Sequence, residues 1–323
     1  MRAPSLANLL YLDVLEMYGN SRRAAELCFL SQSSIYRSAM ALSQELGFNL
    51  HKCDGAYQCT HNLDVLANLR EAAQMLRARS GAPLRLQADY RSPLLRRSLS
   101  KTLWHLPQTW LGLRHSLQHL DAALLDLLIV RSSELLPLLG QLHQPLAVGQ
   151  WRYTPRHALL PLNTETVQVY AKPQHPLLER SALQPKHLAA YPSPALSESQ
   201  VPGLRQRLQP HGLGTTLVRR KTMQPGFWEH FALEHQMLVP STPNAITAAT
   251  SHAPGSLEPL TYPTGLTDHD VLVVPQALLD EPAIQQAIQV ITAAYNLVMP
   301  SLRLLAGLSH RQLRPSPIRS RQA

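Results

Sequence analysis

The sequence predicts an N-terminal winged helix-turn-helix domain that is mainly α-helical, then a long linker helix and a C-terminal α/β domain. Residues 19–46 carry two short helical patterns that are joined by a tight turn. Asp54 and Gly55 stand between two short extended segments, and this dipeptide favours a β-hairpin, the wing. After residue 83, short strand patterns alternate with helical ones, which is typical of an α/β fold.

The second helix of the pair has an apolar and a polar face. Ile35, Ala39, Leu42 and Leu46 recur at spacings of four, three and four, so they form one apolar stripe. Ser31 stands where an N-cap is expected, with its side-chain oxygen placed to accept a backbone N–H. The opposite face is polar and carries Ser33, Ser34, Arg37 and Ser38.

A polar face of this kind is typical of a helix that lies in the major groove of DNA. The pattern alone also fits an ordinary helical hairpin with a solvated face. Before this pair, Leu6, Leu10, Val14 and Met17 predict a first helix that closes a small three-helix core.

Residues 63–79 predict a long helix, with an apolar stripe of Leu63, Leu66, Leu69, Ala73 and Leu76. The helix is expected to end at residues 80–83, Ser-Gly-Ala-Pro. From the pattern alone, this stripe serves either contact with a second chain or docking on the helix's own domain.

Beyond residue 83 we expect strands separated by helices, with a final helix that starts at Pro282. A single doubly wound domain and a two-lobed domain both fit this periodicity. The main strand candidates are residues 84–89, 124–130, 167–172 and 270–275.

Composition indicates a globular protein of two or three domains: 323 residues, 45% hydrophobic and 16% charged. We expect a cytoplasmic location, because three cysteines do not suggest a disulfide framework and no membrane span or export signal is evident. The net charge of +9 does not by itself indicate nucleic-acid binding. Residues 1–80 hold eight basic and seven acidic residues, whereas the tail at 301–323, expected to be disordered, holds five arginines and no acid.

Several segments resemble the family of LysR-type transcriptional regulators. Residues 24–32 are similar to its Ala-Ala-x-x-Leu-x-x-Ser-Gln signature, and Arg37 falls at its serine-arginine pair. Residues 45–50 resemble the Glu-Leu-Gly-x-x-Leu that ends the family's recognition helix, and residues 175–177 resemble its later His-Pro-Leu.

This resemblance implies a two-lobed effector domain like a periplasmic binding protein, with the chain crossing between lobes near residues 160–166 and 262–270. It also implies homodimerisation through the linker helix, with a tetramer and an RNA polymerase contact as further options. The expected boundaries are 1–62 for the winged helix-turn-helix, 63–80 for the linker helix, 84–300 for the effector domain (lobe I at 84–160 and 268–300, lobe II at 165–262) and 301–323 for the basic tail.

The partner expected from the polar helix face is double-stranded DNA, with the helix-turn-helix at Ser21 to Met40. Arginine pairs with guanine and glutamine with adenine, while hydroxyls accept either base. A competing interpretation is a small-molecule-binding or assembly module without gene-regulatory activity. The residues expected at base edges are Gln32, Ser33, Ser34, Tyr36 and Arg37, and those expected at phosphates are Arg22, Arg23 and Lys52. Ser31 is a further DNA-binding candidate at the start of the same helix.

A small-molecule effector, unidentified, is expected between the two lobes, and no cofactor is expected. Ser92 and Ser197 are candidate effector contacts because each follows a strand pattern, where backbone donors gather. A plain capping or turn role fits either serine as well.

Four residues around the Asp54-Gly55 turn suggest an alternative as a metal- or redox-responsive regulator. If strand alternation placed them on one face, they would form a zinc ligand set. Their spacing is not a common zinc motif, so no metal is expected. The residues are His51, Cys53, Cys59 and His61.

We expect no enzymatic activity. The sequence has no Gly-x-Ser-x-Gly elbow, phosphate-binding loop or dinucleotide fingerprint. His230 and His235 flank Glu234, but residues five apart on a helix point in different directions and cannot share a metal.

Overall fold

The computed structural model describes most of the chain between residues 6 and 298. The described ranges are 6–53, 56–88, 103–106, 113–131, 146–148, 151–153, 156–195, 206–217, 227–243, 246 and 257–298. The basic tail predicted at 301–323 lies outside them.

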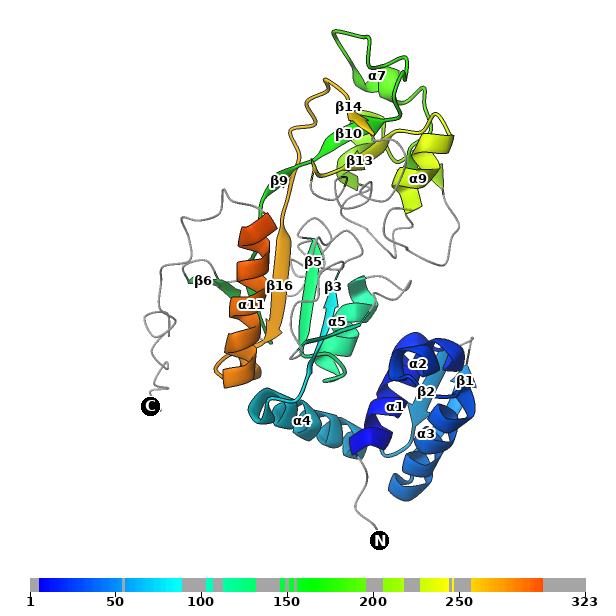
Figure 1. Cartoon of the computed structure of the whole chain (residues 1–323), viewed down its shortest axis with the longest axis vertical. Helices are drawn as coiled ribbons and strands as arrows, with labels where there is room; N and C mark the ends of the chain where they lie inside the picture. Colours follow the sequence, from blue (N-terminus) through cyan, green and yellow to red (C-terminus); the bar gives the residue numbers. More distant parts are fainter. Residues whose placement is uncertain are drawn as a thin grey trace, which may run out of the picture.

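Three helices and a hairpin form the N-terminal domain (Figure 1). The predicted apolar stripe is confirmed, because Ile35, Ala39 and Leu42 are buried and Leu46 packs against the same core. The predicted first helix forms and buries Val14 and Met17 as expected, but Leu6 is 52% exposed. Its other core residues are Leu9, Leu12 and Leu15. The elements are α1 (Leu6–Tyr18), α2 (Ser21–Cys28), α3 (Gln32–Leu46), β1 (Asn49–Cys53) and β2 (Ala56–Thr60).

The long helix α4 (Leu63–Ser80) leads from this domain to the α/β region (Figure 1). The predicted apolar stripe is divided between the two sides of the helix: Leu66 and Ala73 are buried, whereas Leu63 and Leu76 are exposed. The buried face also includes Arg70 and Gln74, which have polar partners in neighbouring elements. Hydropathy alone therefore does not reveal that polar side chains share the face of α4 that packs on its neighbours.

Lobe I is built on a mixed sheet with strand order β4-β3-β5-β16-β8-β7-β6 among the described residues. β3 pairs in parallel with β4 and β5, and the remaining neighbours are antiparallel. Its strands are β3 (Leu84–Ala88), β4 (Leu103–Leu106), β5 (Leu127–Arg131), β6 (Leu146–Val148), β7 (Trp151–Tyr153), β8 (His157–Pro161) and β16 (Asp270–Pro275).

Two helices cover opposite faces of this sheet (Figure 1). α11 (Pro282–Val298), which starts at the predicted proline, packs on the face that includes Ile129 and Leu272. α5 (Leu113–Asp121) packs on the face that includes Val130 and Val271. Because both faces are covered, the central strands β5 and β16 carry continuous apolar runs, at residues 127–130 and 271–274.

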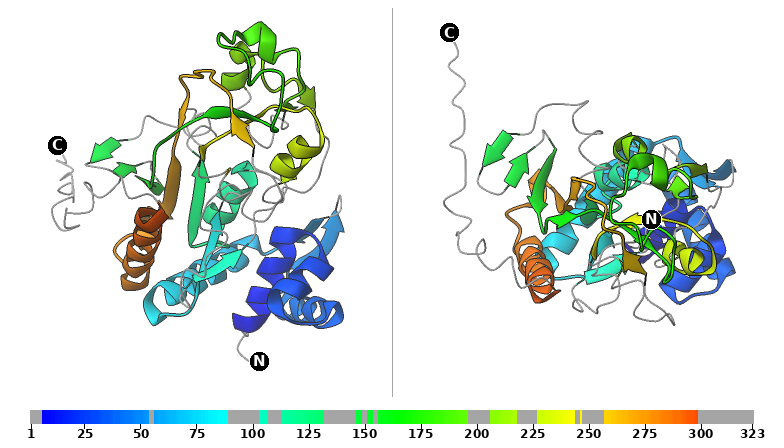
Figure 2. Two further views of the ribbon diagram at one scale, coloured as in Figure 1. Left: turned by 45° about the horizontal axis from the view of Figure 1, so that its top comes forward. Right: turned by 90° about the horizontal axis from the view of Figure 1, so that it is seen from above.

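Lobe II is a smaller α/β unit beyond one end of the lobe I sheet (Figure 1 and Figure 2). The chain passes between the lobes through the antiparallel pair β9 and β15. The short elements here are β9 (Glu165–Thr166), β10 (Gln168–Ala171), α7 (Pro185–Leu188), β11 (Pro194–Ala195), β12 (Thr216–Leu217), α9 (Phe227–Glu234), β13 (Val239–Ser241), β14 (Glu258–Pro259) and β15 (Thr267–Asp268).

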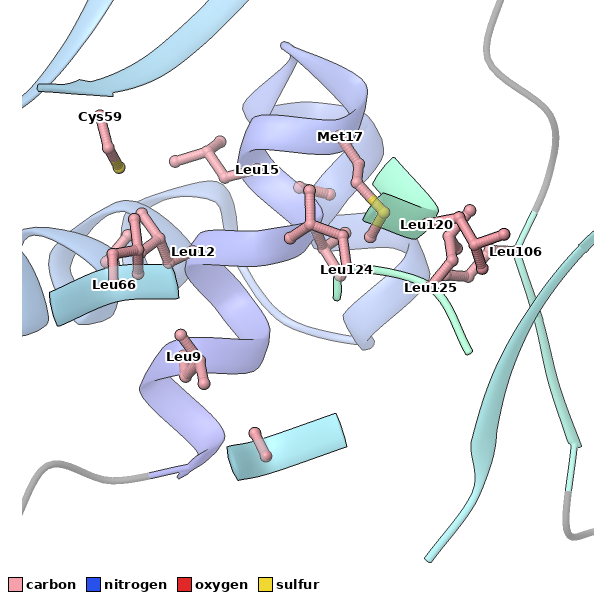
Figure 3. Packing of buried hydrophobic residues seen from close by; sticks show 14 of the residues in the cluster. Leu9, Leu12, Leu15, Met17, Cys59, Leu66, Leu106, Leu120, Leu124 and Leu125 are labelled. Carbon is pink, nitrogen blue, oxygen red and sulfur yellow. The ribbon is translucent and has the colours of Figure 1, made fainter. Parts of the chain in front are cut away.

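The N-terminal domain shares one apolar core with lobe I. Met17 of α1 lies near Leu120 of α5, and Leu124 and Leu125 belong to the same cluster (Figure 3). Burial of this continuous apolar surface holds the two units together.

A buried ionic network joins the same elements. The Asp13 carboxylate accepts hydrogen bonds from Arg70 Nε of α4 at 2.9 Å and from Arg85 Nη1 of β3 at 2.7 Å. Glu16 also pairs with Arg70. Although burial alone would lower it, the carboxylates of Asp13 and Glu16 raise the pKa of the Arg70 guanidinium above its usual value. Arg70 therefore stays charged within the interface.

α4 is fixed to lobe I by further polar contacts. Gln74 Nε2 donates to the carbonyl of Leu125 at 2.6 Å, and Arg77 forms a bidentate pair with Asp126 at 2.8 and 2.9 Å.

No described helix has the length and apolar character needed to span a bilayer.

Candidate nucleic-acid interface

The first helix of the candidate helix-turn-helix, α2, begins at a side-chain cap that the sequence analysis missed. The Asn20 side chain accepts hydrogen bonds from the backbone N–H groups of Arg22 at 2.9 Å and Arg23 at 3.3 Å. Both arginine side chains also contact Glu26, at 3.3 and 3.1 Å. These exposed pairs are weak in water, so a phosphate can replace Glu26 at small cost.

The turn between α2 and α3 is formed by Phe29 and Leu30. Phe29 has φ of 56°, the left-handed conformation that commonly ends a helix, and its ring is 93% exposed. The predicted cap at Ser31 is confirmed, because its Oγ accepts the N–H of Ser34 at 3.2 Å. The start of α3 is thus defined by its own side chains.

α3 presents the polar face that the sequence predicts. Gln32, Ser33, Tyr36 and Arg37 are exposed, whereas Ser34 is half-buried and its hydroxyl lies 2.8 Å from that of Ser31. Tyr36 and Arg37 lie one turn after Gln32 and Ser33, so the four side chains share one side of the helix.

Two contacts orient side chains on this face. Arg37 Nε donates to the carbonyl of Ser33 at 3.3 Å, one turn earlier. Ser21, the first residue of α2, donates its hydroxyl to Gln32 Oε1 at 3.5 Å. The two helix starts therefore lie next to each other, at the end of α3 that enters DNA in helix-turn-helix proteins.

The wing is the hairpin β1–β2, as the Asp54-Gly55 dipeptide predicts. Its base is fastened to the end of α3, because Asn62 Nδ2 donates to the carbonyls of Leu46 at 3.3 Å and Gly47 at 3.1 Å. Gly47 ends α3 with φ of 72°, and a Cβ there would lie 2.9 Å from Asn62. Both the left-handed backbone and the close approach of Asn62 favour glycine.

An aromatic and cationic cluster links the wing to α3. The Lys52 ammonium lies 5.6 Å from the centroid of the Tyr57 ring, and the Tyr57 ring lies 6.1 Å from that of Tyr36. The sequence analysis named Lys52 and Tyr36 but missed Tyr57. The register of the hairpin, which pairs Lys52 with Tyr57, is the signal that reveals it.

The hairpin register does not place all four candidate metal or redox residues of the wing on one face. In the hairpin register, His51 faces Gln58 and Cys53 faces Ala56, whereas Cys59 faces Leu50 on the opposite face. Cys59 is buried, and its burial raises the pKa of the thiol to about 12, so it stays protonated. His61 lies beyond β2, next to the Asn49 side chain. Among the described residues, no three metal-binding side chains gather.

Ser92 and Ser197, the candidate effector contacts, lie outside the described residues. At the crossing between the lobes, the structure instead shows a buried charged group that the sequence analysis missed. Arg131 of β5 lies 3.0 Å from Asp270 of β16 and 3.6 Å from Glu165 of β9. Its Nη2 donates to Thr242 Oγ1, just after β13 of lobe II, at 3.1 Å. Arg131 therefore joins both lobes and the crossing strand.

No family model matches the sequence, and a comparison with curated proteins finds no match. Solved structures do resemble the fold. A full-length OxyR variant from Pseudomonas aeruginosa is 18% identical, covers 92% of this chain and 96% of its own, and superposes with a TM-score of 0.52. The probable transcriptional regulator PA0477 from Pseudomonas aeruginosa is 17% identical and covers 90% of this chain and 96% of its own. Its TM-score is also 0.52.

These likenesses extend over the N-terminal domain, the linker helix and both lobes, because each covers nine-tenths of the chain or more. At this level of identity they establish the fold. The chain therefore shares the fold of these two full-length structures: a winged helix-turn-helix, a linker helix and a two-lobed α/β domain.

Proposed function

We propose that the chain is a sequence-specific transcriptional regulator of the LysR type that binds double-stranded DNA through α3. The observation that carries this proposal is the exposed side of α3, where Gln32, Tyr36 and Arg37 project above a buried apolar stripe. Guanidinium and amide groups are the side chains that read guanine and adenine in the major groove. Arg22 and Arg23 at the start of α2, with Lys52 on the wing, supply phosphate contacts.

Replacing Arg37 by alanine should cost about 1–3 kcal/mol at one base position and relax the preference there. The reason is that arginine discriminates guanine through two acceptors, and alanine has no donor. The measurement is a gel-shift competition between a selected operator and its single-base variants. If Arg37→Ala ranks all the variants as the wild type does, Arg37 is not a base contact.

Lys52→Ala is the matched control, since it also removes one exposed positive charge from the same surface. Loss of the Lys52 charge should weaken binding to all DNA sequences alike. It should also reduce the slope of log affinity against log salt concentration by about one. The contrast between the two variants separates base recognition from general attraction to the phosphate backbone.

We further propose that the chain forms a homodimer through α4. Lobe I and α1 occupy one face of this helix, and next to it lies a second apolar stripe whose members are exposed except for the half-buried Leu69. Val65, Leu69, Ala72 and Leu76 form that stripe at spacings of four, three and four, the repeat of a helix-packing seam. A second copy of α4 covers such a stripe, and two copies bring two α3 helices to neighbouring half-sites.

Leu76→Glu should convert the dimer into a single chain of 36.0 kDa, because it places a charge in the middle of an apolar seam. Leu76 is 50% exposed in the single chain, so its own fold should be little affected. Light scattering of the purified protein gives the mass. Asn68→Glu, which adds the same charge to α4 outside the stripe, should leave the dimer intact. An equal mass distribution for wild type and Leu76→Glu would contradict the proposed seam.

The control of DNA binding by a small molecule is part of the same proposal. Two lobes joined by crossing strands are the arrangement in which a ligand between them changes their relative position. The shared core and the ionic network around Asp13 attach the N-terminal domain to lobe I. A change in lobe I is thereby transmitted to the position of α3.

A further inference from the structure

We propose that Tyr57 is a positioning residue for DNA binding, which ties the wing to α3 and holds Lys52 ready for the phosphate backbone. This role rests on the proposed DNA-binding function. It concerns a residue that sequence reasoning did not select, and its support comes from two independent contacts of one ring.

The first contact is with Lys52. The two residues are direct cross-strand partners in the β1–β2 hairpin, so their side chains leave the same face of the wing. The Lys52 ammonium lies 5.6 Å from the Tyr57 ring centroid, within the range of a cation–π attraction. The ring therefore restricts a side chain that otherwise samples many rotamers.

The second contact is with α3. The Tyr36 and Tyr57 rings are 6.1 Å apart and inclined at 52°, a tilted geometry common for aromatic pairs. Tyr57 is half-buried against the core of the N-terminal domain, whereas Tyr36 is 41% exposed. Tyr57 thus provides an anchored surface for a side chain on the exposed face of α3.

The consequence is that one ring connects a phosphate contact on the wing with a side chain on the base-reading face. Long lysine side chains lose rotamer entropy when they are fixed. Restriction of Lys52 before DNA arrives reduces this loss at the moment of binding. The hairpin face that carries Lys52 and Tyr57 also carries Leu50 and Cys59, which are buried, so the wing cannot turn away from α3 without exposing them.

The first arm of the test needs no DNA. The chain has five lysines, so carbon-13 dimethylation gives a spectrum that can be assigned with single Lys→Arg variants. Dimethylation keeps the positive charge. In the full-length protein, the Lys52 signal should be shifted upfield by the ring current of Tyr57. Tyr57→Phe should keep this shift, and Tyr57→Leu should remove it.

The second arm measures binding to a synthetic mixed-sequence duplex over a series of salt concentrations. Tyr57→Leu should weaken binding but leave the salt slope nearly unchanged, because Lys52 keeps its charge, whereas Lys52→Met should lower the slope by about one. Adding Tyr57→Leu to Lys52→Met should produce little further loss, because without Lys52 the ring has no ammonium to hold. Tyr57→Phe should bind as the wild type does, which separates the ring from the hydroxyl.

Three results overturn the proposal. An unshifted Lys52 signal in the wild type means that the ring does not hold the ammonium. Wild-type binding by Tyr57→Leu, with Lys52→Met impaired, means that Lys52 acts without Tyr57, and the proposed DNA binding then stands. A wild-type chain that binds no duplex contradicts the proposed function itself, and the role of Tyr57 falls with it.

Discussion

Replacing Asp13 by leucine should lower the free energy of unfolding by about 3–5 kcal/mol. Asp13 is buried in α1 and accepts hydrogen bonds from the guanidinium groups of Arg70 and Arg85. Leucine has a similar volume but no charge, so Arg85 would keep its buried position without the carboxylate that pairs with it. A buried charge without its partner is far more costly than an exposed one.

Urea unfolding followed by circular dichroism measures this loss. Arg79→Ala is the control, because it breaks the pair between Arg79, whose side chain is 64% exposed, and Glu281. Exposed pairs contribute at most about 1 kcal/mol. Asp13→Leu should also increase cleavage after Arg79 by trypsin, since Asp13 helps to attach α1 and α4 to lobe I. A loss no larger than that of Arg79→Ala would show that the network does not hold the domains together.

Replacing Arg131 by methionine should cost about 3–5 kcal/mol in the same measurement. The Arg131 side chain is 1% exposed, and it lies between the carboxylates of Asp270 and Glu165. Without the guanidinium, two buried like charges face each other where the chain crosses between the lobes. Arg207→Met is the control, since Arg207 is only half-buried and its Nη2 donates to the carbonyl of Thr267 at 2.8 Å. Such a bond contributes about 1 kcal/mol.

The loss at Arg131 should be largely reversed when the carboxylates are neutralised as well. In the triple variant Arg131→Met, Glu165→Gln, Asp270→Asn, no charge remains in the cluster. Replacing a whole buried ionic group is often close to neutral, whereas removing one member is not. If the triple variant is as unstable as Arg131→Met, the cost comes from lost packing and not from electrostatics.

The helix-turn-helix was predictable because its signals are local. The spacing of Ile35, Ala39 and Leu42 and the serine before α3 lie within a few turns of one helix, and the structure places each as expected. The strand at residues 270–275 and the helix from Pro282 were equally clear, because an apolar run and a proline at the first helical turn are local features.

The faces of α4 and of the wing were not predictable with the same rules. On α4, Arg70 and Gln74 are buried because partners in α1 and lobe I satisfy them, and hydropathy counts such residues as exposed. In the wing, the two-residue turn pairs Cys53 with Ala56. That register places Cys59 on the face opposite to Cys53, which alternation along each strand alone does not show.

The buried ionic groups had no signal in the sequence. Asp13 and Arg85 are 72 residues apart, and Arg131 and Thr242 are 111 apart. Each looks like a surface residue until the fold brings its partner into contact. Both groups lie where two units meet, one between the N-terminal domain and lobe I and the other between the lobes.

The most direct test of the account is selection of genomic DNA fragments by the purified full-length chain, followed by footprinting of the enriched fragments. If α3 reads DNA, one motif should be enriched, with two half-sites about one helical turn apart. The wild type should protect both half-sites in the footprint, and Arg37→Ala should lose protection at one base position in each. Recovered fragments with the composition of the input, or a footprint unchanged by Arg37→Ala, would contradict it.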